Sequence, residues 1–192
     1  MNTSPLILAS ASPRRRELLY QLGISPQVWP ATLDEQPHPG ESPAVYVQRI
    51  AREKAEAVWQ ASGGHQPVLA ADTGVVLEGL IFGKPQNRQH AIDMLSALSG
   101  REHQVLSAVC LRTTAGQGER LSVSQVSFRS LSPDEIEAYW LSGEPADKAG
   151  AYAIQGKGAV FIRHLVGSYS GVMGLPLYET AALLAEWGFS WS

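Results

Sequence analysis

Short apolar runs suited to buried strands alternate along this chain with amphipathic segments that carry helix-capping residues. Helices are expected to begin at three Ser-Pro pairs, because serine caps a helix and proline fits its first turn. The expected helices span residues 12–23, 42–60, 87–100, 132–141 and 176–187, and the expected strands 6–9, 68–71, 75–77, 80–82, 104–112, 121–128 and 159–164. Strands, hairpins and helices in this order predict an α/β fold with an extended mixed sheet flanked by helices.

Two regions of the chain are expected to be irregular. In the expected strand 121–128, the alternation of apolar and polar residues changes phase between Val123 and Val126, which predicts a bulge there. The glycine-rich region 143–174 is expected to hold loops and the single strand 159–164.

Length and composition restrict the class of protein. The 192 residues, of which 44% are apolar and 17% charged, suit one globular domain over 1–192. Fifteen Lys and Arg against eighteen Asp and Glu give a net charge of −3. This charge is opposite to that of a typical nucleic-acid binder, so no nucleic-acid partner is expected. With no signal peptide and no transmembrane run, we expect a cytoplasmic protein without a membrane partner.

The single cysteine, Cys110, lies within the apolar run 105–111. It has no partner for an internal disulfide, which predicts a buried thiol in a reducing compartment. A reactive thiol is the alternative.

Three consecutive arginines, Arg14, Arg15 and Arg16, fall in the opening turn of the first expected helix. Positive side chains oppose the helix dipole there, and the free N–H groups at that end also favour an anion. A phosphate site that includes the hydroxyls of Ser10 and Ser12 would explain the pattern. A solvated basic turn capped by Ser12 would explain it equally well.

Two further charged residues stand in apolar surroundings. Lys54 falls on the apolar stripe of the second expected helix, where it must either reach solvent or meet an anion. Asp72 follows the apolar run 68–71, and a carboxylate at the mouth of a buried strand suits a general base or a metal ligand. A turn-forming aspartate would look the same.

Charge balance connects these residues to one ligand. A nucleoside triphosphate carries roughly −4 and its magnesium ion about +2. Arg14, Arg15, Lys54 and Lys84 would bring four positive charges, and Glu35 and Asp72 two negative ones. The total is close to zero, as a closed site requires.

The sequence resembles the Maf family of nucleoside triphosphate pyrophosphatases. The similarity begins with Leu-Ile-Leu-Ala-Ser-Ala-Ser-Pro-Arg-Arg at 6–15 and follows the whole chain in order. The other matching segments are 34–35, 52–55, 71–73, 83–85, 99–100, 143–145, 147–152, 154–156, 167–169 and 174–177.

The resemblance implies an inosine-triphosphatase-like fold with two lobes and a central cleft. It implies hydrolysis between the α- and β-phosphates, with Asp72 as the proton acceptor. Glu35 and Asp72 would bind a divalent cation, Mg or Mn. The residues expected to bind the phosphates are Ser10, Arg14, Arg15, Lys54 and Lys84.

Three positions indicate the branch of the family. Arg14, Thr73 and Gln155 resemble the branch that acts on dTTP and UTP, whereas the 7-methyl-GTP branch carries Trp, Gln and Glu there. A glutamine amide can both donate to and accept from the imide edge of uracil or thymine. Base-modified analogues such as 5-methyl-UTP are expected substrates as well.

Other functions stay open at this stage. The family is associated with septum formation, which implies a housecleaning or division-arrest role and leaves a non-catalytic nucleotide-binding regulator as the alternative. A nucleic-acid module built on Arg14–Arg16 is a third hypothesis, and salt-sensitive nucleic-acid binding would support it. A homodimer is what the family suggests.

Overall fold

The computed structural model describes residues 5–189 and is built on three long antiparallel strands. These are β3 (Val68–Leu77), β5 (Glu102–Thr113) and β6 (Gly116–Phe128). β7 (Ile162–Val166) adds an antiparallel edge to β6, while β1 (Ile7–Leu8) and β2 (Gln27–Val28) continue the sheet beyond β3 in parallel. With β4 (Leu80–Phe82) also paired to β3, the sheet is mixed, as predicted.

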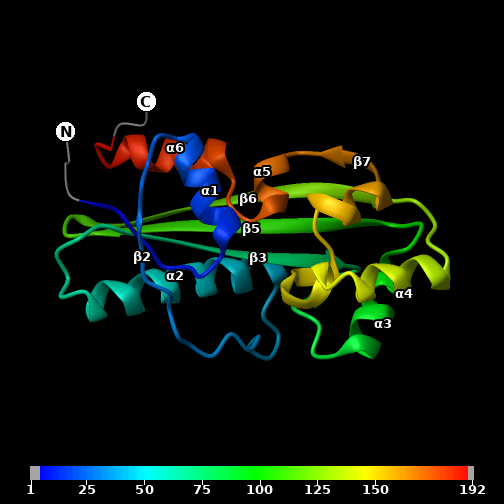
Figure 1. Cartoon of the computed structure of the whole chain (residues 1–192). Coiled ribbons are helices and arrows are strands. Elements are labelled where there is room, and N and C mark those ends of the chain that lie inside the picture. Colours follow the sequence, from blue (N-terminus) through cyan, green and yellow to red (C-terminus); the bar gives the residue numbers. More distant parts are fainter. Residues whose placement is uncertain (1–4, 190–192) are drawn as a thin grey trace.

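Helices cover both faces of the sheet at one end of the long strands (Figure 1). α2 (Pro43–Ala61) packs on one face, and α1 (Pro13–Gln21) and α6 (Leu177–Glu186) pack on the other. Because side chains alternate along a strand, Val68 and Ala70 contact the α2 side and Leu69 and Ala71 the opposite side.

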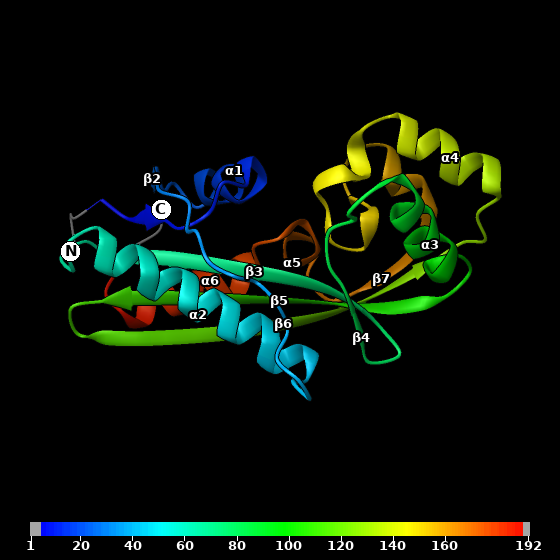
Figure 2. The ribbon, with the colours of Figure 1, turned by 90° about the horizontal axis from the view of Figure 1, so that it is seen from below.

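A second lobe forms at the other end of the long strands, which run through both lobes (Figure 2). It contains α3 (Arg88–Leu98) and α4 (Pro133–Leu141), packed around a separate core that includes Leu95, Phe128 and Tyr152. Three short 3₁₀ turns follow α4 in this lobe, at Glu144–Asp147, Ala149–Ala151 and Gly156–Phe161. α5 (Tyr169–Met173) then returns the chain to the first lobe.

The helix starts follow the expected capping chemistry only in part. Ser132 forms the predicted capping box with Glu135, through Oγ to the Glu135 amide at 3.2 Å and a return bond of 2.9 Å. Ser12 and Ser42 occupy N-cap positions, but their side chains form no capping hydrogen bond. None of the helices within residues 5–189 has the length and apolarity needed to cross a bilayer.

The expected end of a strand at Ala71 is wrong. β3 continues through Asp72, Thr73 and Gly74 to Leu77, because β5 pairs with it along the whole stretch. The cross-strand ladder thus overrides the turn-forming tendency of Asp-Thr-Gly. The predicted bulge is also misplaced, since β6 pairs with β5 without interruption and its register shift occurs against β7, between Ser127 and Phe128.

Two short elements were not expected. β2 is only two residues long and exposed, and α5 lies in the glycine-rich region assigned to loops. β7 begins at Ile162, because residues 156–161 form a 3₁₀ turn. Elements this short have too few residues for a periodic pattern.

Cys110, on β5, is completely buried in the core on the α2 side of the sheet, and burial raises the pKa of its thiol to about 12. We expect the native protein to be inert to a thiol reagent such as DTNB at pH 8, and the denatured protein to release one equivalent. Rapid modification of the native protein would contradict this burial.

Candidate functional site

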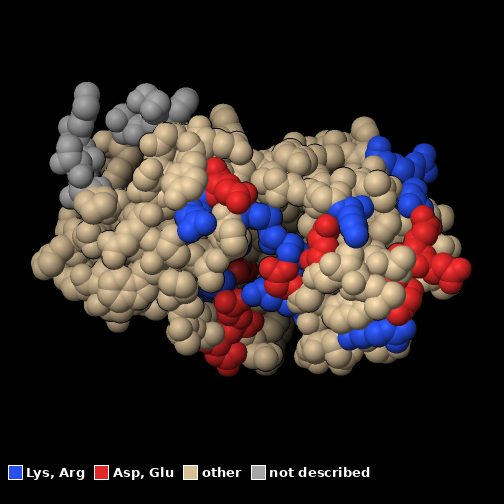
Figure 3. Space-filling model, in the orientation of Figure 1, with Lys and Arg blue, Asp and Glu red and all other residues tan. Residues whose placement is uncertain are grey.

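The central cleft opens where β3 has an unpaired edge. On that edge, β1 pairs with residues 68–69 of β3 and β4 pairs with residues 75–77. Between them, residues 70–74 have β5 as their only strand partner among the described residues. The gap holds Asp72 and Thr73, and Figure 3 shows blue and red side chains gathered around the hollow between the lobes.

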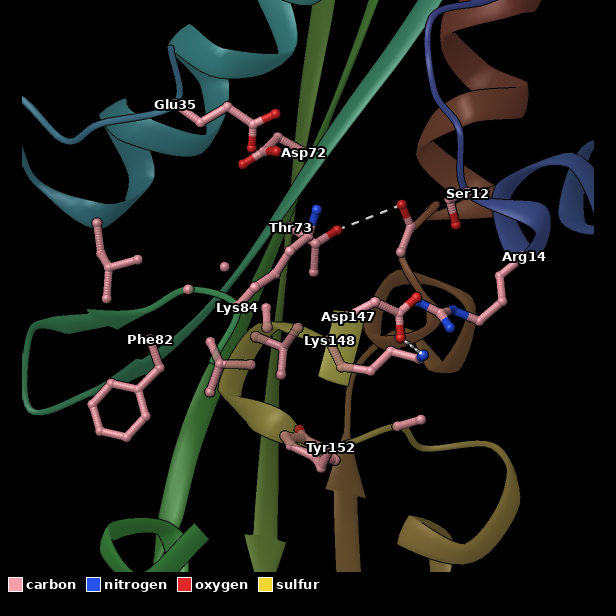
Figure 4. A pocket seen from close by; sticks show the side chains of 18 of the residues that line it. Ser12, Arg14, Glu35, Asp72, Thr73, Phe82, Lys84, Asp147, Lys148 and Tyr152 are labelled. Carbon is pink, nitrogen blue, oxygen red and sulfur yellow. Dashed lines mark hydrogen bonds and ion pairs between the residues drawn. The ribbon is translucent and has the colours of Figure 1, made fainter. Parts of the chain in front are cut away.

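Asp72 and Glu35 share one cation, the ammonium group of Lys54. Lys54 Nζ lies 2.8 Å from Asp72 Oδ1 and 2.9 Å from Glu35 Oε1. Lys54 and Asp72 are 8% and 6% exposed, so both charges lie in the interior, while Glu35 approaches from the segment before α2. Figure 4 shows the two carboxylates pointing toward each other. Lys54 therefore meets anions and does not reach solvent.

The electrostatics of Asp72 are set mainly by burial. Removal from water raises the pKa of its carboxyl above the ordinary value, while the positive charges of Lys54 and Arg15 oppose that rise. A carboxyl with a raised pKa at an open strand edge can accept a proton from water or from a bound ligand.

Arg15 is held in a fixed orientation by hydrogen bonds to three residues that line the cleft. Its Nε donates to the carbonyl of Gly174 at 2.7 Å, and its terminal nitrogens donate to Ser10 Oγ at 3.2 Å and Thr73 Oγ1 at 3.3 Å. Burial lowers the pKa of Arg15, and the charges of Asp72 and Glu35 oppose this effect. The guanidinium is thus pre-oriented beside the two acids.

The opening of the cleft is lined by four further charged side chains, those of Arg14, Lys84, Asp147 and Lys148. In Figure 4, Arg14 extends from α1 toward Asp147, and Lys84 points from the segment after β4 toward Thr73. Asp147 forms an ion pair with Lys148 on the second lobe. The two lobes therefore face each other with charged side chains across the cleft.

All nine residues predicted from the sequence line this one cleft, which has a volume of about 1100 Å³. They are Ser10, Arg14, Arg15, Glu35, Lys54, Asp72, Thr73, Lys84 and Gln155. Asp72 lies in the middle of β3 and not at its end, and Ser12, whose hydroxyl was also considered, lines the cleft as well.

Several residues in and around the cleft are not among the predicted site residues, although Asp147 and Lys148 lie in a segment that carries the family resemblance. Asp147 and Lys148 lie in a 3₁₀ region whose fold was not predicted, and Tyr46 is on α2 with its hydroxyl donating to the carbonyl of Glu35 at 2.9 Å. Ser107 supports Thr73 from β5 at 2.9 Å and donates to the Gly171 carbonyl at 2.6 Å. Such contacts depend on tertiary proximity, which periodicity does not reveal.

Removing the shared cation should destabilise the protein in a pH-dependent way. We expect Lys54→Met to lower the free energy of unfolding by roughly 3 kcal/mol at pH 8, as for a broken buried ion pair. The raised pKa of Asp72 means that the folded state binds a proton more readily than the unfolded state, so ionisation destabilises the fold as pH rises. Without Lys54 this cost grows, and the loss should be smaller at pH 5.

Denaturant unfolding at both pH values measures this difference. Arg52→Met on the same helix is the control, since its ion pair with Glu119 is partly exposed and should contribute at most about 1 kcal/mol. Equal losses for the two variants at pH 8 would contradict a buried pair at Lys54.

Comparisons with known proteins were consistent along the chain. The family model described as "Maf-like protein" matches residues 5–187. A dTTP/UTP pyrophosphatase of Methylococcus capsulatus is 56% identical, covering 95% of this chain and 91% of the relative. Proteins of the same name from Chromobacterium violaceum and Nitrosomonas europaea are 52% and 55% identical, covering 98% and 96% of this chain and 97% and 95% of the relatives.

Among solved structures, the Ham1 protein of Staphylococcus aureus is 15% identical, with a TM-score of 0.48 over 65% of this chain and 71% of that one. The family model matches nearly the whole sequence, and the relatives above are more than 50% identical to it. This chain belongs to the Maf family.

Proposed function

We propose that this protein hydrolyses dTTP and UTP, and base-modified analogues such as 5-methyl-UTP, to the nucleoside monophosphate and pyrophosphate. The names and high identity of the relatives support this activity. The observation that carries it is the charged cleft, where a buried acid of raised pKa lies beside several cations. A polyanion that reacts with water at one phosphorus requires both features.

The cations hold the phosphates on two sides of the cleft. Arg15 is oriented by Gly174 and Thr73, so it loses little conformational freedom when it donates to a phosphate oxygen. Arg14 and Lys84 add charge from α1 and from the segment after β4. Together with Lys54 they stabilise the negative charge that develops on the phosphoryl oxygens in the transition state.

The acidic pair fits a divalent cation, Mg or Mn. Both carboxylates lie within 3 Å of Lys54 Nζ, so they converge on one point of the cleft and supply the hard oxygen ligands that such an ion prefers. The described residues include no cluster of three or more His, Cys, Asp or Glu for a metal. The remaining ligands would be phosphate oxygens and water, as is usual for magnesium, and the ion would offset triphosphate charge.

Asp72 acts as the base in this proposal. Its raised pKa makes it a stronger proton acceptor than an exposed aspartate, while the positive charges of Lys54 and Arg15 favour its ionised form. The base removes a proton from the water that attacks the α-phosphorus. Pyrophosphate then leaves toward the cations of the cleft.

Gln155 and Thr73 are proposed to select the base. Gln155 is half-buried on the cleft and can present both a donor and an acceptor to an imide edge. The Thr73 hydroxyl bonds to Ser107 and Arg15, so Thr73 would contribute to selectivity indirectly, by fixing Arg15 next to the nucleotide.

Asp72→Asn should lower kcat for dTTP by about 100-fold or more, because an amide cannot accept the proton. Pyrophosphate and orthophosphate are assayed separately with saturating magnesium, and dTTP binding is measured in parallel. Asp134→Asn, on the exposed first turn of α4, is the matched control and should keep wild-type turnover.

The outcomes of this assay are distinct. Near-normal turnover by Asp72→Asn would show that another group is the base. A wild-type protein that binds dTTP without releasing product would favour the non-catalytic regulator. Dominant release of orthophosphate would contradict cleavage between the α- and β-phosphates.

Gln155→Glu should lower kcat/KM for dTTP by at least about tenfold, because the carboxylate loses the N–H donor that the imide edge requires. Activity on 7-methyl-GTP should rise relative to dTTP in the same panel. Pyrophosphate inhibition should be unchanged, since the phosphate side is intact. An unchanged ratio of the two nucleotides would exclude Gln155 as a base-selecting residue.

A further inference from the structure

The carboxylate of Glu144 accepts hydrogen bonds from α4 and from the segment that carries Gln155. Its Oε1 accepts from the Tyr139 hydroxyl at 2.8 Å and from the Gly158 amide at 3.0 Å, and its Oε2 accepts from the Lys157 amide at 2.9 Å. Glu144 itself is not among the residues that line the cleft. The charged side chain of Glu144 therefore holds the backbone of residues 157–158 without lining the cleft itself.

Tyr139 connects the Glu144 carboxylate to the backbone of Ala153, which precedes Gln155 in the chain. While its hydroxyl donates to Glu144, it accepts from the amide of Ala153 at 3.1 Å. The ring is buried and stands edge-to-face on Phe161 with centroids 4.9 Å apart, so the hydroxyl has a fixed position. The amides of residues 153, 157 and 158 are thus tied to one centre, with Gln155 between them.

Two glycines allow the backbone to come this close. A Cβ on Gly156 would lie 2.5 Å from Glu144 Oε2, and the φ of +78° there also favours glycine. A Cβ on Gly158 would lie 2.4 Å from the Ala153 carbonyl and 2.6 Å from the Tyr139 hydroxyl. The segment is therefore shaped around the Tyr139–Glu144 pair.

The carboxylate is held in its charged form. Burial alone would raise the pKa of Glu144, but the bonds from Gly158, Lys157 and Tyr139 together bring it below its ordinary value. Hydrogen bonds to an ionised acceptor are stronger than those between neutral groups, so the attachment of this segment is firm.

We propose that Tyr139 and Glu144 are positioning residues that fix the 153–158 segment and thereby set the base selectivity of Gln155. This proposal rests on the proposed nucleotide activity. A glutamine that reads an imide edge must hold its donor and acceptor in one orientation, and a loosened backbone would lose discrimination while the phosphate-binding cations on the other elements stay in place.

The test uses Glu144→Gln, Glu144→Ala and Tyr139→Phe in the full chain. An amide at 144 keeps one acceptor but turns a donor toward a backbone N–H, and alanine removes both acceptors. Tyr139→Phe keeps the ring packing and removes the bridging hydroxyl. Glu137→Gln, on α4 where Glu137 pairs with Arg88 of α3, is the matched control.

We expect the ratio of kcat/KM for dTTP to that for 7-methyl-GTP to fall by about tenfold in Glu144→Gln and Tyr139→Phe, and further in Glu144→Ala. The inhibition constant of inorganic tripolyphosphate should change less than about twofold, since that ligand carries no base. Hydrogen exchange of the amides of residues 153, 157 and 158 should become faster. The control should match wild type in all three measurements.

Two results would overturn the proposal. Parallel weakening of dTTP and tripolyphosphate would indicate general damage to the cleft, and faster exchange with an unchanged nucleotide ratio would show that the segment does not select the base. Failure of the proposed function is distinguishable, because it is seen as absent dTTP hydrolysis by the wild-type protein.

Discussion

The ammonium group of Lys54 is shared by two carboxylates, and the charged cleft depends on this arrangement. Asp72 comes from the middle of β3, Glu35 from the segment before α2 and Lys54 from α2 itself, so one cation links sheet, loop and helix. Buried charges of this kind are tolerated only when they are paired. The same pairing leaves an acid of raised pKa at the unpaired edge of the sheet, beside the fixed guanidinium of Arg15.

Most of the fold could be predicted from local patterns, and the errors of that prediction have two causes. Helix starts at Ser-Pro pairs and apolar runs identified the long elements, because capping and periodicity are local properties. Asp72-Thr73-Gly74 was misread as the end of a strand, since pairing with β5 overrides turn propensity and is not visible in the residues themselves. The short β2 and α5 were missed for lack of any period.

The site was predictable where a residue conflicts with its local surroundings. Lys54 on an apolar stripe and arginines at a helix N-terminus are unfavourable unless an anion is near, so they could be recognised without coordinates. Their roles came from the family resemblance. Ser107, Tyr139 and Glu144 satisfy local rules as surface or core residues, and their importance arises from hydrogen bonds between distant segments. Ser107 and Tyr139 have no distinguishing pattern in the sequence, and the family resemblance at 143–145 includes Glu144 without indicating its role.

The central claim is that the acids and cations of this cleft direct water to the α-phosphorus of a nucleoside triphosphate. Hydrolysis of dTTP in ¹⁸O-labelled water, followed by mass spectrometry of both products, tests it directly. The account predicts that the label enters the phosphate of dTMP and is absent from pyrophosphate. Label in pyrophosphate, with none in dTMP, would place the attack at the β-phosphorus and contradict it.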